Sequence, residues 1–84
     1  MVIKLTSEEL DLFERLVQCE AGSEDMVGKI LVANVIINRV NSSKFSNTVT
    51  GVITSPKQFS PVGSGAIYSA VPTQETKEAV QRAL

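Results

Sequence analysis

The chain has 84 residues, a formal net charge of −1 and 43% hydrophobic residues. This length allows a single domain, the apolar content excludes a disordered chain, and the balanced charge offers no attraction for nucleic acid or an anionic membrane. The single cysteine excludes a disulfide within the chain and a cysteine metal cluster. The absence of histidine excludes a Ser–His–Asp or Cys–His site. We expect no metal and no cofactor.

The N-terminal segment, MVIKLTSEEL, has neither the apolar core nor the small-residue cleavage site of a signal peptide. No apolar run reaches the ~18 residues that a membrane-spanning helix needs. The sequence therefore predicts a protein without a membrane span that is made without an export signal or has lost it. We expect its first six residues to form a short extended lead-in.

The first predicted helix covers residues 7–21. Thr6 followed by Glu9 has the pattern of a capping box, in which each side chain binds a backbone amide of the first turn. Along the helix, apolar side chains at helical spacing occupy one half of the circumference and polar side chains the other. The pattern indicates a helix that packs one face against the core.

Glu20 breaks this pattern, because on a helical wheel it falls in the apolar half, roughly 20° from Phe13 and roughly 40° from Leu16. A carboxylate at that place must leave water, unless a cleft opens there. Partial burial and the negative end of the helix dipole would both favour the protonated carboxyl group. Those effects suit a general acid that works near neutral pH. The alternatives are a Glu20 paired with Arg39 or Lys29 inside the fold, or one exposed by fraying.

The second predicted helix covers residues 25–40 and is apolar on nearly every side, which is typical of a central helix packed against several neighbours. Asn34 and Asn38 lie four residues apart on one stripe. We expect both amides to be buried, and buried amides need partners, so they either tie down the returning loop or line a polar cleft. We expect Asn34, Asn38 and Arg39 to be structural groups near the site.

A short helix is predicted over residues 49–54, followed by an irregular segment over residues 55–72 that holds all three prolines. Within it, residues 58–60 and 66–68 could pair as a small hairpin. Pro72-Thr73 then opens a last helix that runs to the end of the chain. Its apolar side chains would provide a surface for a partner or for self-association: Ala79, Val80, Ala83 and Leu84.

Several motifs in a fixed order resemble the bacterial cell-wall hydrolase family that includes the spore cortex-lytic enzymes. They are Glu20-Ala21-x-x-Glu24, Gly28, the run ANVIINRV that ends at Val40, Val52-Ile53, and Phe59-Ser60-Pro61-Val62-Gly63. The resemblance covers most of residues 8–84. The start without an export signal is closest to the germination-specific branch, which is held in the spore coat.

The resemblance implies a lysozyme-like α+β fold that is mainly helical, with about four helices and a long loop or small hairpin between the third and the fourth. Residues 1–84 would form a single domain that represents the first part of a longer one. The implied activity is cleavage of peptidoglycan, in the spore cortex or cell wall, between N-acetylmuramic acid and N-acetylglucosamine. The family's catalytic acid maps onto Glu20.

Two catalytic routes stay open. In a muramidase, Glu24 is the candidate for the second carboxylate that glycoside hydrolysis normally uses. In a lytic transglycosylase, Glu20 alone protonates the glycosidic oxygen and then acts as base on the sugar's 6-hydroxyl. Gln58, Ser60 and Tyr68 are the candidates for contacts with the glycan. The alternatives to an enzyme are a catalytically incomplete fragment that binds glycan and a helical protein-interaction module.

Overall fold

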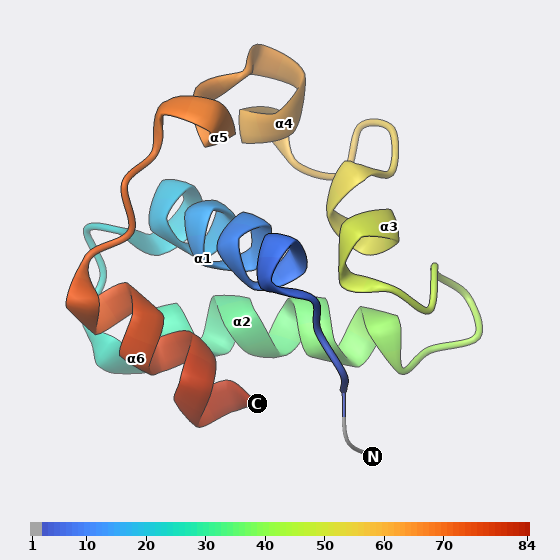
Figure 1. Cartoon of the computed structure of the whole chain (residues 1–84), viewed down its shortest axis with the longest axis horizontal. Coiled ribbons are helices and arrows are strands. Elements are labelled where there is room, and N and C mark those ends of the chain that lie inside the picture. Colours follow the sequence, from blue (N-terminus) through green and yellow to red (C-terminus); the bar gives the residue numbers. More distant parts are fainter. Residues whose placement is uncertain (1–2) are drawn as a thin grey trace.

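A computed structural model of the chain describes residues 3–84, and in that range it contains helices and no β-strand. The helices are α1 (Ser7–Ala21), α2 (Met26–Val40), α3 (Val49–Thr54), α4 (Ser60–Ser64), α5 (Ala66–Ser69) and α6 (Gln74–Ala83). Helix α1 lies in the middle of the molecule and contacts each of the others (Figure 1). The mainly helical class is confirmed, and the α+β label is not.

The extended lead-in expected over residues 1–6 can be compared with the structure only for residues 3–6. Residues 3–6 belong to no helix or strand, and the first two residues of the chain lie outside the described range. None of the helices in that range combines the length and the hydropathy that crossing a bilayer requires.

Helix α1 begins at the predicted capping box. Thr6 Oγ1 accepts a hydrogen bond from the Glu9 amide at 3.1 Å, and Glu9 Oε1 accepts one from the Thr6 amide at 3.3 Å. The other carboxylate oxygen of Glu9 accepts from the amide and the hydroxyl of Thr50, each at 3.3 Å. Glu9 therefore caps α1 and also ties it to the first turn of α3.

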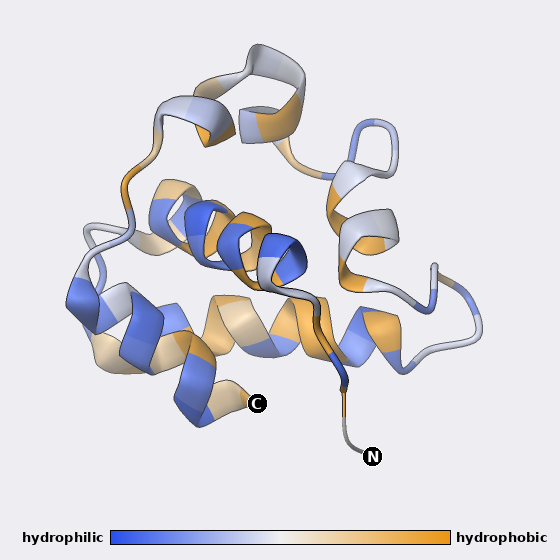
Figure 2. Cartoon of the chain, viewed as in Figure 1, coloured by the Kyte–Doolittle hydropathy of each residue, from blue (hydrophilic) through white to orange (hydrophobic). Residues whose placement is uncertain are grey.

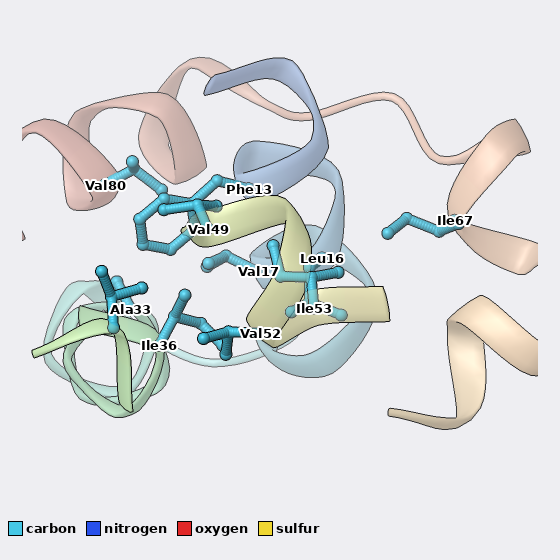
Figure 3. Close-up of a cluster of buried hydrophobic side chains, with 11 residues drawn as sticks. Phe13, Leu16, Val17, Ala33, Ile36, Val49, Val52, Ile53, Ile67 and Val80 are labelled. Atoms are coloured by element: carbon cyan, nitrogen blue, oxygen red, sulfur yellow. The ribbon is translucent and has the colours of Figure 1, made fainter. Parts of the chain in front are cut away.

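The hydrophobic core lies where α1, α2, α3 and α6 meet, and Figure 3 shows Phe13 of α1 near its centre, close to Val49 and Val80. Its buried members are Phe13, Leu16, Val17, Ala33, Ile36, Val40, Val49, Val52, Ile53, Ile67 and Val80. Full burial of a side chain of this size contributes roughly 1.5–3 kcal/mol. The helices hold together because each amphipathic face is buried against the others.

Helix α2 is capped by Asp25, whose Oδ1 accepts a hydrogen bond from the Gly28 amide at 2.9 Å. It packs against α1, α3 and α6, as expected of a central helix, and apolar residues recur along it (Figure 2). One row of them is nevertheless open to solvent, because Val27, Leu31 and Val35 are 63%, 60% and 43% exposed. The prediction that this helix is packed on nearly every side is wrong for that row.

The two amides of α2 are not buried either. Asn38 is exposed and Asn34 is half-buried. Over residues 3–84, no buried polar side-chain atom lacks a hydrogen-bond partner. The expectation of two buried amides is wrong, because this stripe of α2 faces partly toward solvent.

Residues 55–72 form two short helices in place of the expected hairpin. Pro61 stands in the first turn of α4, where its missing amide hydrogen costs no helical bond. Gly65 ends α4 with φ = 82°, a left-handed conformation that glycine adopts without strain. The next helix, α5, places Ile67 in the core. The glycines that suggested a hairpin tip therefore belong to a helix and its C-terminal cap.

The last helix, α6, does not present its apolar side chains to a partner. Ala79 and Val80 are fully buried within the chain, and Ala83 packs against the core at its edge. Of the four residues proposed for self-association, only Leu84 is largely exposed, at 47%. The predicted surface is wrong for Ala79 and Val80, because α2 and α1 already cover them.

Candidate functional site

Glu20 lies in the last turn of α1 and borders an open groove of about 340 Å³. Val32 and Val35 of α2 form another side of this groove, and Gln58 and Phe59 come from the segment between α3 and α4. Three parts of the chain that are distant in sequence therefore meet around one carboxylate. We call this space the Glu20 groove.

Glu20 is exposed and borders a groove. Of the two outcomes expected at this position, partial burial is therefore wrong, and an opening beside the side chain is what the structure has. The helical wheel placed Glu20 on the side of α1 that faces its neighbours. This agrees with the structure, because Glu20 borders the same groove as Val32 and Val35 of α2. The wheel could not show that the packed surface ends before the last turn of α1. There an open groove takes the place of a neighbouring side chain.

Neither basic residue of α2 forms an ion pair with Glu20. Lys29 is 3% exposed, and its Nζ donates to Glu75 Oε1 at 2.9 Å and to the Glu24 carbonyl. Arg39 Nη1 donates to Gln58 Oε1 at 3.1 Å. In the described part of the chain, the ion pairs join Asp11 to Arg15, Lys29 to Glu75 and Glu78 to Arg82. The paired alternative for Glu20 therefore does not hold.

Of the other candidate residues, only Gln58 lines the Glu20 groove. Ser60 lines a neighbouring groove of about 370 Å³ that shares Phe59 with the first. Glu24 is exposed and does not belong to the lining of either groove. Tyr68 is 74% exposed and also lies outside both linings. The structure thus brings Gln58 to Glu20, Ser60 to the adjoining groove, and neither Glu24 nor Tyr68 to this place.

Sequence reasoning missed the apolar lining of the groove, which consists of Val32, Val35 and Phe59. The two valines lie three residues apart on α2, and helical spacing puts them on one face. Nothing in the sequence tells whether that face borders a neighbour or a groove. Phe59 stands in the family-like motif, but a ring that plugs the loop onto the core would have the same pattern.

The thiol next to Glu20 is not an activated nucleophile. Cys19 is half-buried and free, and burial, followed by the negative charge of Glu20, raises its pKa. The thiolate is the reactive form of cysteine. At neutral pH this group therefore stays protonated, and Cys19 is not a candidate nucleophile.

The sequence matches the family described as Cell Wall Hydrolase over residues 23–84. A Bacillus cereus protein named spore cortex-lytic enzyme is 39% identical over 79 residues, which are 94% of this chain and 30% of that protein. The chain spans less than a third of the length of the curated relatives with this name. The family match begins just after Glu20.

Two solved structures share the fold. One is the catalytic domain of the germination-specific lytic transglycosylase SleB from Bacillus anthracis, with a TM-score of 0.86 and 36% identity, covering 99% of this chain and 67% of that one. The other is the catalytic domain of the Bacillus cereus SleB protein, with a TM-score of 0.85 and 39% identity, covering 95% and 62%. The lysozyme-like helical fold expected from the motifs is the fold that this chain shares with them.

Proposed function

Because the chain belongs to the Cell Wall Hydrolase family, we propose that it cleaves the glycan strands of peptidoglycan with Glu20 as general acid and base. The observation that carries the proposal is the exposed carboxylate of Glu20 in a groove that also contains the Gln58 amide. The names of its relatives, spore cortex-lytic enzyme and germination-specific lytic transglycosylase, favour the spore cortex or cell wall as the substrate.

A single carboxylate lining the Glu20 groove favours the lytic transglycosylase route. Among the described residues, no other carboxylate lines it, whereas ordinary glycoside hydrolases use two, ~5–5.5 Å or ~6.5–9.5 Å apart. In this route, Glu20 donates its proton to the glycosidic oxygen while the bond to the anomeric carbon breaks. The carboxylate then takes the proton of the same sugar's 6-hydroxyl, whose oxygen bonds to the anomeric carbon and yields a 1,6-anhydro end.

The shape of the surface suits an extended polymer. The Glu20 groove and its neighbour share Phe59, so a strand lying in the first can continue past the ring into the second, where Ser60 stands. Gln58 offers an amide that can donate to or accept from sugar hydroxyls and acetamido groups. We assign Gln58 to the first groove and Ser60 to the second. Tyr68 lines neither groove, so the proposal gives it no role.

The test is release of soluble muropeptides from purified spore cortex, followed by mass spectrometry. We expect Glu20→Gln to reduce the rate roughly 10²–10⁴-fold, the usual contribution of general acid–base catalysis. Glu24→Gln is the matched control, and its rate should stay close to that of the unmodified chain. The released ends should be 1,6-anhydro. Normal release by the Glu20→Gln variant would refute the assignment, and loss of activity in Glu24→Gln would favour the muramidase route.

A second candidate function is glycan binding without cleavage. It is favoured by the extent of the structural match, because the chain corresponds to only about two thirds of each solved catalytic domain. Groups that complete the site in those domains could lie outside the matched part. Co-sedimentation of the chain with sacculi, without release of muropeptides, would support this function over the enzymatic one.

A further inference from the structure

Arg39 connects two loops at the end of α2. Its Nη1 donates to Gln58 Oε1 at 3.1 Å, and its Cζ lies 5.1 Å from the ring centroid of Phe45 and 5.3 Å from that of Phe59. A guanidinium within about 6 Å of an aromatic ring is attracted to it. Phe45 follows α2, whereas Gln58 and Phe59 follow α3, so one side chain fixes both segments.

This guanidinium has no carboxylate partner among the described residues, because none of the three ion pairs includes Arg39. Its contacts are the two rings and the Gln58 amide, and Gln58 and Phe59 both line the Glu20 groove. Arg39 itself does not line it. Any influence of Arg39 on a bound glycan must therefore pass through these two groove residues.

The chemistry of arginine decides how Gln58 is turned. Arginine carries donors only, so it can hold only the carbonyl oxygen of the Gln58 side chain. The NH₂ group of the same amide is then left for other contacts, and it can only donate. Without Arg39, an exposed glutamine would sample several rotamers and could present either end of its amide.

We infer that Arg39 is a positioning residue that fixes Gln58 so that its NH₂ group is the one presented to the glycan. The matching group on the substrate is an oxygen acceptor, and among the uncharged oxygens of an N-acetylated sugar the acetamido carbonyl is the strongest. This inference rests on the proposed function of the Glu20 groove. It adds to the catalytic acid Glu20 a second group, the NH₂ of Gln58, that selects N-acetylated sugars.

The first measurement is independent of activity. We would follow the side-chain NH₂ resonances of Gln58 by NMR in the unliganded chain and in Arg39→Met, a variant that retains an unbranched apolar side chain and removes the guanidinium. Arg82→Met is the matched control, since Arg82 pairs only with Glu78 on α6. We expect an ordered Gln58 amide in the unmodified chain and in the control, and an averaged one in Arg39→Met. A Gln58 that is equally ordered, or equally averaged, in all three would overturn the inference.

The second measurement separates positioning from folding. With soluble N-acetylated glycan strands, Arg39→Met should raise KM about tenfold with little change in kcat, as expected when ground-state and transition-state binding are lost equally. In a Gln58→Ala background, the same change should alter KM by less than about twofold, because the two residues act through one contact. A variant that merely folds poorly would lower kcat at constant KM, and that result would also overturn the inference.

Failure of the two proposals can be told apart. If Glu20→Gln cleaves normally, the enzymatic assignment falls, while the Gln58 resonances still report on Arg39. If the unmodified chain shows no turnover, the affinity for tri-N-acetylchitotriose replaces KM. It should then fall about tenfold in Arg39→Met, and an unchanged affinity would count against the inference.

Discussion

The negative charge of Glu9 contributes to folding. Hydrogen bonds from the backbone amides of Thr6 and Thr50 lower its pKa. A carboxyl group with a lowered pKa in the folded state stabilises the fold at neutral pH, and this contribution is lost as the pH falls through the folded pKa. The loss begins as the pH drops below the ordinary glutamate value of 4.5. Because water still reaches the group, we expect it to amount to less than about 1 kcal/mol.

The measurement is urea unfolding of the chain and of Glu9→Gln between about pH 3 and pH 7. The variant should be less stable at pH 7 and should show a flatter dependence at the acid end. Glu14 provides a control of opposite sign, because burial, opposed by the nearby Lys77, raises its pKa. Its carboxylate therefore opposes folding at neutral pH, and Glu14→Gln should make the acid decline steeper. Parallel curves for all three proteins would contradict this account.

The sequence predicted the identity of the candidate acid but not its surroundings. The helical wheel showed that Glu20 interrupts an apolar face, and this depends only on the period of the helix. Burial depends on how far α2 and the segment after α3 extend over that face. How far these segments extend is set by tertiary packing, and it cannot be predicted from the sequence of one helix. For the same reason Gln58 could be named as a candidate, whereas its contact with Arg39 could not.

Elements with strong local signals were predicted well. The bounds predicted for α1 and α3 agree with the structure, and α2 differs by one residue at its start. Capping side chains mark these helices, and caps act within one turn of the chain. The predicted hairpin over residues 58–68 was wrong, because proline and glycine mark both hairpin tips and the ends of short helices. Which of the two forms is decided by packing against the rest of the chain, such as that of Ile67 in the core, and not by the local residues.

Gly51 in α3 illustrates a constraint at the level of an element. A Cβ atom added there would lie 1.9 Å from Ser46 Oγ, 2.7 Å from Ser46 Cβ and 2.8 Å from Thr48 Oγ1. These groups belong to the cap of α3, because Thr48 Oγ1 accepts from the Gly51 amide at 3.0 Å. Replacing glycine by alanine inside a helix normally stabilises it by up to about 1 kcal/mol. Here the added methyl group would displace the cap.

We therefore expect Gly51→Ala to destabilise the chain by about 1–3 kcal/mol, the usual cost of overpacking or of a lost cap. Gly63→Ala in α4 is the matched control. Apart from the adjoining residues and the backbone of α4, no atom of the described chain lies within 4 Å of the Cβ that it would add, so it should be neutral or slightly stabilising. Thermal unfolding monitored by circular dichroism measures both. An increase in Tm for Gly51→Ala would show that the cap relaxes without cost.

At the scale of the whole molecule, one face of α2 serves the core and another is exposed beside the proposed site. An 84-residue chain buries only about 60–65% of its unfolded surface, so its stability margin is thin. Helix α2 nevertheless leaves the row Val27, Leu31 and Val35 open, and the last of these residues borders the Glu20 groove. The apolar surface that is not used for folding is therefore continuous with the proposed site. Stability rests on the opposite face of α2, where Ala33 and Ile36 enter the core.

Two residues on α2 test this division of the helix. Ile36 is fully buried and Leu31 is 60% exposed, and both side chains have the same number of carbon atoms. We expect Ile36→Ala to reduce the free energy of unfolding by about 2–5 kcal/mol, because it removes buried surface and leaves a cavity. Leu31→Ala should change it by less than about 0.5 kcal/mol, since solvent already surrounds that side chain. Urea denaturation at a series of protein concentrations measures both values. A large, concentration-dependent cost for Leu31→Ala would mean that a second copy of the chain covers this row in solution.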